Sequence, residues 1–194
     1  MFQLRRFASL LCALFLAACA HPISLAPNLT KLDPPAGAVR AGTVGLYVSA
    51  ADKERQVVTP GGGGDKVSYY PYRELEAGIY KTLGIVFERV IVVASPTAVV
   101  ALSKAGVSMV ARPQIITQSS SSSVLTWPPT DFQVQLSCTF ADVGGTAIAE
   151  TLVTGIGHAD FEEFKSDFSL AAKRAAEDAL NKTQKAIIAE KKLK

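Results

Sequence analysis

An alternation of apolar and polar residues over 132–140 is the feature that most constrains the fold of this chain. Five apolar side chains alternate there with four polar ones: Phe132, Val134, Leu136, Cys138 and Phe140 against Gln133, Gln135, Ser137 and Thr139. Because successive side chains of a strand point to opposite faces, the pattern indicates an antiparallel strand with one buried and one solvated face. A hairpin turn at 142–145 and a partner strand over 146–159 are predicted to follow, with Gly155 and Gly157 loosening the end of that strand.

Other periodic segments complete the set of predicted elements. Residues 43–49, 88–94 and 107–118 are rich in β-branched residues and indicate strands. A helix is predicted over 71–87, where apolar residues recur at spacings of three and four, and a second one over 160–190, which begins with a capping-box pair and has an alanine-rich stripe. The predicted fold class is therefore α+β: a two-layer sandwich whose mixed, mostly antiparallel sheet of about five strands carries two main helices on one face.

Two polar stretches are predicted to be exposed loops. The segment 50–70 contains Gly61–Gly64, but Asp65 precedes Lys66 and no Ser or Thr follows the lysine, so it lacks the pattern of a phosphate-binding loop. The run of serines at 119–123 leads to Trp127 and two prolines. Trp127 is a candidate for partner contact or for the lipid headgroup layer, and the alternative, that it covers a sheet edge, stays open. Gln133 and Gln135, on the solvated face, are further candidate contacts.

The N-terminus has the organisation of an export signal. Arg5 and Arg6 form a positive region, residues 7–16 form a short apolar run, and small residues lead into Cys19. The run is too short to span a bilayer as a finished helix. The sequence Leu16-Ala17-Ala18-Cys19 resembles the lipobox of bacterial lipoproteins.

That resemblance implies cleavage between Ala18 and Cys19, acylation of Cys19, and attachment to a membrane through the lipid. Ala20, where some lipoproteins have aspartate, resembles the pattern of lipoproteins sent to the outer membrane, so we expect a Gram-negative outer-membrane protein facing the periplasm. The domains would be a signal peptide (1–18), a lipidated proline-rich tether (19–41), one α+β domain (42–190) and a basic tail (191–194).

Charge and composition exclude several function classes. Loss of Arg5 and Arg6 lowers the net charge from +3 to +1, which gives no basic footprint for nucleic acid. Cys12 is lost with the signal, so Cys138 has no disulfide partner. Cys138 lies on the buried face of its strand. We therefore expect an inert thiol rather than a nucleophile activated by His158. Neither a metal site nor a cofactor motif is indicated by the spacing of the two histidines and one free cysteine.

The order of elements, the Trp/Pro loop before a long hairpin and the alanine-rich final helix resemble small Gram-negative envelope lipoproteins of the YajG-like and LptE-like groups. No catalytic residues accompany this resemblance. It implies a non-enzymatic accessory or structural role in envelope assembly or transport, exerted through contacts with an envelope protein. The alternative is a module that binds a small molecule, lipid or glycan in a pocket between sheet and helices, and a hydrolase is the third hypothesis.

Overall fold

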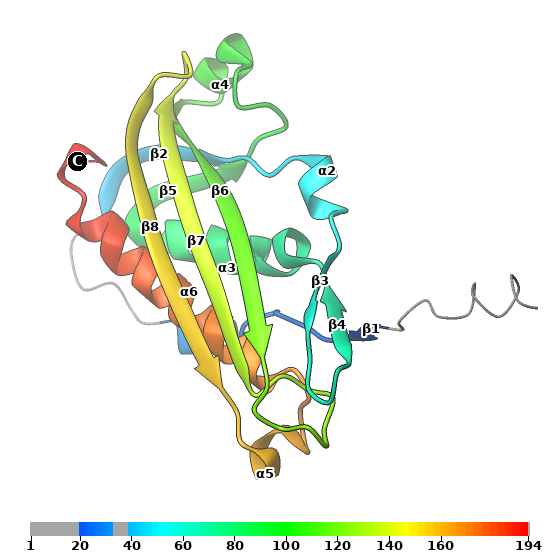
Figure 1. Cartoon of the computed structure of the whole chain (residues 1–194). Coiled ribbons are helices and arrows are strands. Elements are labelled where there is room, and N and C mark those ends of the chain that lie inside the picture. Colours follow the sequence, from blue (N-terminus) through cyan, green and yellow to red (C-terminus); the bar gives the residue numbers. More distant parts are fainter. Residues whose placement is uncertain (1–19, 33–38, 194) are drawn as a thin grey trace, which may run out of the picture.

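The centre of the molecule is a mixed five-stranded sheet (Figure 1), seen in a computed structural model that describes residues 20–32 and 39–193. Its strands lie in the order β5-β2-β6-β7-β8. Their bounds are β2 (Arg40–Leu46), β5 (Phe87–Val92), β6 (Val107–Ser120), β7 (Asp131–Asp142) and β8 (Ala147–His158). β2 pairs in parallel with β5 and β6, whereas β6, β7 and β8 are antiparallel. The predicted α+β class with a mixed sheet of five strands is confirmed, and the longest pairings in the sheet, β6 with β7 and β7 with β8, are antiparallel.

Two helices, α3 (Pro71–Val86) and α6 (Leu170–Ala189), cover one face of the sheet. The apolar side chains of α3 that recur at helical spacing are buried, as are the inward-facing residues of β7. The helices meet at Gly78, where an added Cβ would lie 2.5 Å from Cδ1 of Leu180. A third, short helix, α4 (Val99–Lys104), lies on the opposite side of the sheet and covers only one end of it, over Val107 and Val110.

Glycines in β8 let α6 approach the sheet unusually closely. A Cβ on Gly155 would lie 2.2 Å from the carbonyl oxygen of Ala175, and one on Gly157 would lie 2.0 Å from that of Ala171. Real Cβ atoms do not tolerate such distances from backbone, so only glycine fits at either place. The two glycines therefore do not loosen the strand; they form its contact with the alanine stripe of α6.

A second sheet of three strands was not predicted. It has the order β1-β4-β3, from β1 (Ala20–Pro22), β4 (Lys66–Tyr69) and β3 (Val57–Pro60). β3 and β4 form a hairpin within the segment 50–70, which also contains the one-turn helix α2 (Ala50–Lys53). The glycine run is the turn of this hairpin. Because Gly62 donates its N–H to the carbonyl of Trp127 at 2.8 Å, the turn is held against the loop that follows β6.

The segment before β2 belongs largely to the folded body. β1 pairs in parallel with β4, and the short helix η1 (Leu29–Lys31) follows. Ile23, Leu25 and Leu32 are buried in the main core. Residues 20–32 thus pack on the domain instead of forming the predicted extended tether. Their apolar side chains were sparse and separated by prolines, so no periodicity revealed them.

The C-terminal region also differs from the prediction. A short helix, α5 (Phe161–Phe164), precedes α6 as a separate element, although the N–H of Asp160 does donate to the Glu163 carboxylate at 3.1 Å as a capping box requires. After α6, the turn η2 (Lys191–Leu193) folds back and buries Leu193. Arg40 donates to the carbonyl of Leu193 at 2.9 Å, so the predicted basic tail is docked through residue 193. Among the described residues, no helix combines the length and apolarity needed to cross a bilayer.

Candidate functional site

The outer face of strands β6, β7 and β8 is a broad surface that no described element covers beyond the end under α4. Gln135 lies at its centre, paired with Ile116 on one side and Thr154 on the other. Gln133 is paired with Gln118 and Ile156. Three aliphatic residues of this face, Ile116, Leu152 and Ile156, are exposed by 57–60%. Gln133 and Gln135 thus lie on the uncovered face that the alternation predicted.

Charged side chains lie at the two ends of this outer face and not at its centre. Arg112, Thr139 and Glu150 form a row across the three strands, and Ser137 donates a hydrogen bond of 2.9 Å to the Glu150 carboxylate. At the other end of the face Asp131 and His158 are paired across β7 and β8, and the side chains between the two ends are amide, hydroxyl and aliphatic. Charged residues are depleted in the centres of protein–protein interfaces, so this composition suits contact with another protein.

The free edge of the sheet beside this face is blocked by side chains of α6. Asp178 accepts a hydrogen bond from the N–H of Ile156 at 2.9 Å. Lys182 donates to the carbonyl of Thr154 at 2.9 Å, and Arg174 donates to that of His158 at 2.7 Å. These bonds occupy backbone groups with which an incoming strand would pair. The β8 edge is therefore closed to an incoming strand over residues 154–158.

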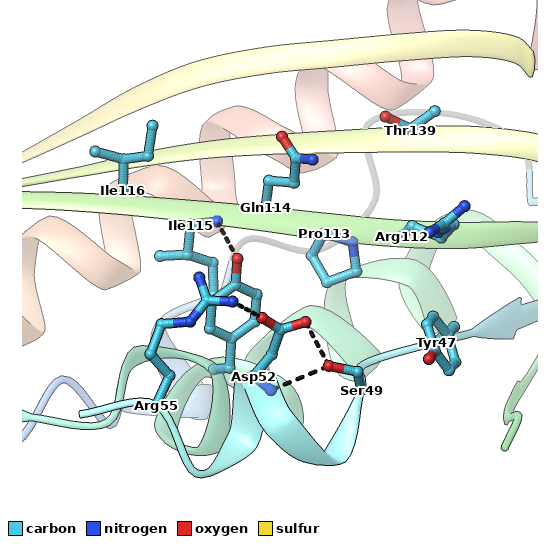
Figure 2. A pocket seen from close by; sticks show the side chains of 11 residues that line it. Tyr47, Ser49, Asp52, Arg55, Arg112, Pro113, Gln114, Ile115, Ile116 and Thr139 are labelled. Atoms are coloured by element: carbon cyan, nitrogen blue, oxygen red, sulfur yellow. Dashed lines mark hydrogen bonds and ion pairs between the residues drawn. The ribbon is translucent and has the colours of Figure 1, made fainter. Parts of the chain in front are cut away.

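A cavity of about 550 Å³ opens beside β6, next to the margin of the outer face (Figure 2). It exists because β2 pairs with β6 only as far as Ala111, after which β2 turns away towards α2. Pro113, which has no N–H, and Ile115, whose N–H donates to the Tyr72 hydroxyl at 3.1 Å, come next along β6. A proline cannot donate to a neighbouring strand and is typical of edges and bulges, and Pro113 lies at the start of this local edge.

The lining of the cavity is mainly polar. Ser49 donates to the Asp52 carboxylate at 2.6 Å, and Asp52 pairs with Arg55 beside it in the lining of the cavity. Arg112 lies 5.9 Å from the ring centre of Tyr47. Two guanidinium groups with hydroxyl and amide neighbours can bind a small polar anion, since arginine presents several donors in a fixed geometry. An apolar ligand would find few partners there.

The structure separates the Cys–His pair that a hydrolase would need. Cys138 is paired with Thr151 and His158 with Asp131, seven residues away along β7, which corresponds to roughly 23 Å. Burial raises the pKa of the Cys138 thiol to about 12. Cys138 is therefore a core residue and cannot act as a nucleophile activated by His158.

His158 is held by two carboxylates at the end of β8. Its Nδ1 lies 2.8 Å from Asp131 Oδ1 and its Nε2 lies 3.1 Å from Asp160 Oδ1. Hydrogen bonds to Asp131 and Asp160 raise the pKa of the imidazole, and the bond to His158 lowers the pKa of the Asp131 carboxyl. Both ring nitrogens are engaged, so neither is available as a general base. Within the described part of the chain, no group of acidic, histidine or cysteine side chains could hold a metal ion.

Trp127 lies apart from the two glutamines. Its indole stacks on His21 and contacts Phe168, with ring centres 4.4 Å and 5.0 Å away. The predicted contact residues thus fall in two places, the outer face and the loop after β6. Sequence reasoning missed Ile116, Leu152 and Ile156, although the alternation of Leu152 and Ile156 with small residues in the partner strand was a usable signal. Cys19 and Ala18 lie outside the described residues.

Comparisons with known proteins add little about function. No family model matches the chain, and no curated protein matches it in sequence. A solved structure of similar shape is the protein XCC0632 from Xanthomonas campestris, which belongs to the family model DUF330. It is 12% identical, the likeness covers 88% of this chain and 91% of that one, and the TM-score is 0.47. A likeness at this level says nothing of what the present chain binds.

Proposed function

We propose that this chain is a lipoprotein of the Gram-negative outer membrane, anchored through an acylated Cys19 and facing the periplasm. Its role is non-enzymatic: it assists envelope assembly or transport by binding another envelope protein. The anchor is supported by the basic, apolar and small-residue segments that end in Leu16-Ala17-Ala18-Cys19. The accessory role is supported by the resemblance to YajG-like and LptE-like lipoproteins.

The uncovered outer face of β6–β8 is the observation that carries the protein contact. Sheets with one solvated face usually present polar side chains there, but this face exposes Ile116, Leu152 and Ile156 around Gln135. Burial of these aliphatic groups by a partner would release water from them, at roughly 25 cal/mol for each Å² of apolar surface. The neighbouring amides would then form the hydrogen bonds that give such a contact specificity.

Site-specific photocrosslinking in the native envelope tests this contact. A photoreactive phenylalanine analogue replaces Gln135 on the outer face or Ala77, an exposed residue of α3 on the opposite side of the molecule. We expect a discrete crosslinked protein from position 135 and not from position 77. Loss of that product in an Ile116→Asp variant would show that the crosslinked protein binds at the outer face.

Two results would contradict the proposed contact. The first is the absence of any discrete product from positions 116, 133 and 135 in cells that contain the folded protein. The second is the same product from position 77, because that result would show that the crosslinked protein does not bind specifically to the outer face. Folding of each variant is verified by protease resistance before the products are compared.

The polar cavity beside Tyr47 supports a second candidate function, the binding of a small anionic ligand. The guanidinium of Arg112 lines the cavity together with Arg55, which is paired with Asp52, and it favours such a ligand over a neutral lipid. A ligand that binds only the folded state raises the melting temperature. We expect stabilisation by anionic sugars or phosphates in the unaltered protein and less in an Arg112→Ala variant, and equal shifts in both would exclude this cavity as the site.

A further inference from the structure

Exposed apolar side chains gather at the end of the molecule where the described chain begins. The cluster, named here the apolar tip, consists of the exposed Val124, Leu125, Phe161 and Phe168 together with Trp127, which is partly buried against the core. Leu125 is 91% exposed and Val124 81%, while Phe161 and Phe168 are each about half exposed. A hollow of about 470 Å³ lies between the loop after β6 and α5 at this end. Soluble proteins rarely expose contiguous apolar surface of this kind unless something binds it.

The apolar tip is built into the fold rather than carried on a free loop. The glycine turn between β3 and β4 holds it, since Gly62 and Gly63 donate to the carbonyls of Trp127 and Ser123 at 2.8 and 3.2 Å. A Cβ on Gly62 would lie 1.9 Å from the carbonyl oxygen of Thr126, so this close packing requires glycine. This packing requirement gives a structural reason for the glycine run at 61–64, which lacks the pattern of a phosphate-binding loop.

Cys19 is joined directly to this end of the molecule. Ala20 pairs with Lys66 in β1, and His21 stacks on Trp127 with ring centres 4.4 Å apart. Two residues of chain reach at most about 7 Å, so the acylated cysteine and the indole are near neighbours. Acyl chains on Cys19 would enter the bilayer core, and the headgroup layer above that core is only about 5–7 Å thick. The apolar tip is therefore within reach of the lipid.

The charged side chains at the apolar tip are of both signs. The carboxylate of Asp65 lies 3.8 Å from His21, and Glu162 is paired with Lys165 at 2.7 Å. Lys165 also lies over the ring of Phe161, with Nζ 4.6 Å from its centre. Aromatic rings flanked by lysine are typical of protein segments that lie in the membrane interface.

We propose that the apolar tip lies in the headgroup layer of the membrane to which Cys19 is attached, and so fixes the orientation of the domain. This inference rests on the proposed anchor. Acyl chains supply the affinity, and Trp127, Leu125 and Phe161 supply the orientation. Strands β6–β8 then run away from the membrane, with the β7–β8 turn and α4 at the far end (Figure 1). The outer face is presented sideways to a partner in the same membrane.

A polarity-sensitive fluorophore on a single introduced cysteine tests the orientation. The label is placed at Leu125→Cys in the apolar tip or at Val100→Cys in α4, which is 83% exposed at the opposite end. The full-length chain, matured in cells, is reconstituted into vesicles of phosphatidylethanolamine and phosphatidylglycerol, and intact mass first verifies the acyl groups. We expect emission at position 125 to shift to the blue and brighten several-fold, and emission at position 100 to stay as in water.

The outcomes separate this inference from the anchor itself. Water-like emission from both positions in acylated protein would overturn the orientation and leave the anchor standing. Emission that changes at position 125 only in native membranes, and not in protein-free vesicles, would assign the apolar tip to a protein and also overturn the inference. A mass without acyl groups would overturn the anchor and, with it, the inference.

Discussion

The imidazole of His21 lies stacked on the indole of Trp127, with 4.4 Å between ring centres and 23° between ring planes. The contact joins the second residue after the proposed acylation site to a loop more than a hundred residues further along the chain. On its other side the indole meets Phe168, so three distant segments converge there. The position of the chain just after Cys19 is thereby tied to the core.

A His21→Ala variant should weaken this convergence. Aromatic pairs contribute about 0.5–1.5 kcal/mol, so we expect the free energy of unfolding in urea to fall by about 1 kcal/mol. Trp127 is the single tryptophan of the chain, and its emission should become more accessible to acrylamide. Val100→Ala, at an exposed site in α4, is the control. Unchanged stability and unchanged quenching in His21→Ala would contradict the stacked arrangement.

Gly155→Ala should be among the most damaging single-methyl additions in the chain. The new Cβ would meet backbone of α6 at Ala175 and Ala179, which cannot move without displacing the helix. Overpacking of this kind costs about 2–3 kcal/mol, measured as the free energy of unfolding. Gly84→Ala is the matched control, because Gly84 is an exposed helical position with nothing within 4 Å of an added Cβ. That control should gain up to about 1 kcal/mol, and similar losses in both variants would refute the close approach.

Cys138 should be inert to thiol reagents while the protein is folded. It is buried, and burial raises the pKa of its thiol to about 12, so hardly any reactive thiolate exists near neutral pH. Labelling by iodoacetamide, followed by mass spectrometry, should be negligible in the native protein and rapid in urea. Fast labelling of the folded chain at Cys138 would revive the hypothesis of a cysteine hydrolase.

The pair of His158 and Asp131 predicts a pH dependence with a definite sign. The folded-state pKa of His158 is raised above its unfolded value of about 6.5. The pair therefore makes its full contribution to the free energy of unfolding at pH values below that unfolded pKa. The stabilisation is lost as pH rises through the folded pKa. An Asp131→Asn variant should therefore be less stable than the unaltered protein at acidic pH, by under about 1 kcal/mol since the pair is exposed, and the difference should shrink as pH rises.

Histidine NMR signals provide the direct readout for that pair. The pKa of His158, followed through its ring protons, should fall towards the ordinary value in Asp131→Asn, while Asp160 retains part of the shift. His21, the other histidine of the chain, is the internal reference. If the titration of His158 does not move, the 2.8 Å contact with Asp131 does not exist in solution.

The main sheet and its helices could be predicted because their residues alternate or recur with a clear period. Phe132–Phe140 and the stripe of α3 predicted buried faces that the structure contains. The glycine contacts of β8 could not be predicted from the sequence. A lone glycine in a strand is compatible both with a locally weakened strand and with a helix packed closely against the strand backbone. Only the position of α6 decides between them.

The small sheet and the apolar tip depend on partners that sequence periodicity does not reveal. β1 has three residues, too few for any alternation, and it is fixed by pairing with Lys66–Ser68. Val124 and Leu125 follow a serine run, and Phe161 begins a one-turn helix, so nothing in the sequence indicated that they meet. Gln133 and Gln135 could be placed on a solvated face, but the aliphatic residues beside them come from other strands.

The acylation of Cys19 is the claim on which the proposed anchor, the orientation and the contact with an envelope partner all depend. Intact mass spectrometry of the protein extracted from membranes measures it directly. We predict a chain that begins at Cys19, lacks residues 1–18 and carries the added mass of acyl chains. In a Cys19→Ala variant both the cleavage and the added mass should be lost. A membrane-extracted protein whose Cys19 carries no acyl group, or which retains the first eighteen residues, would contradict the proposed anchor.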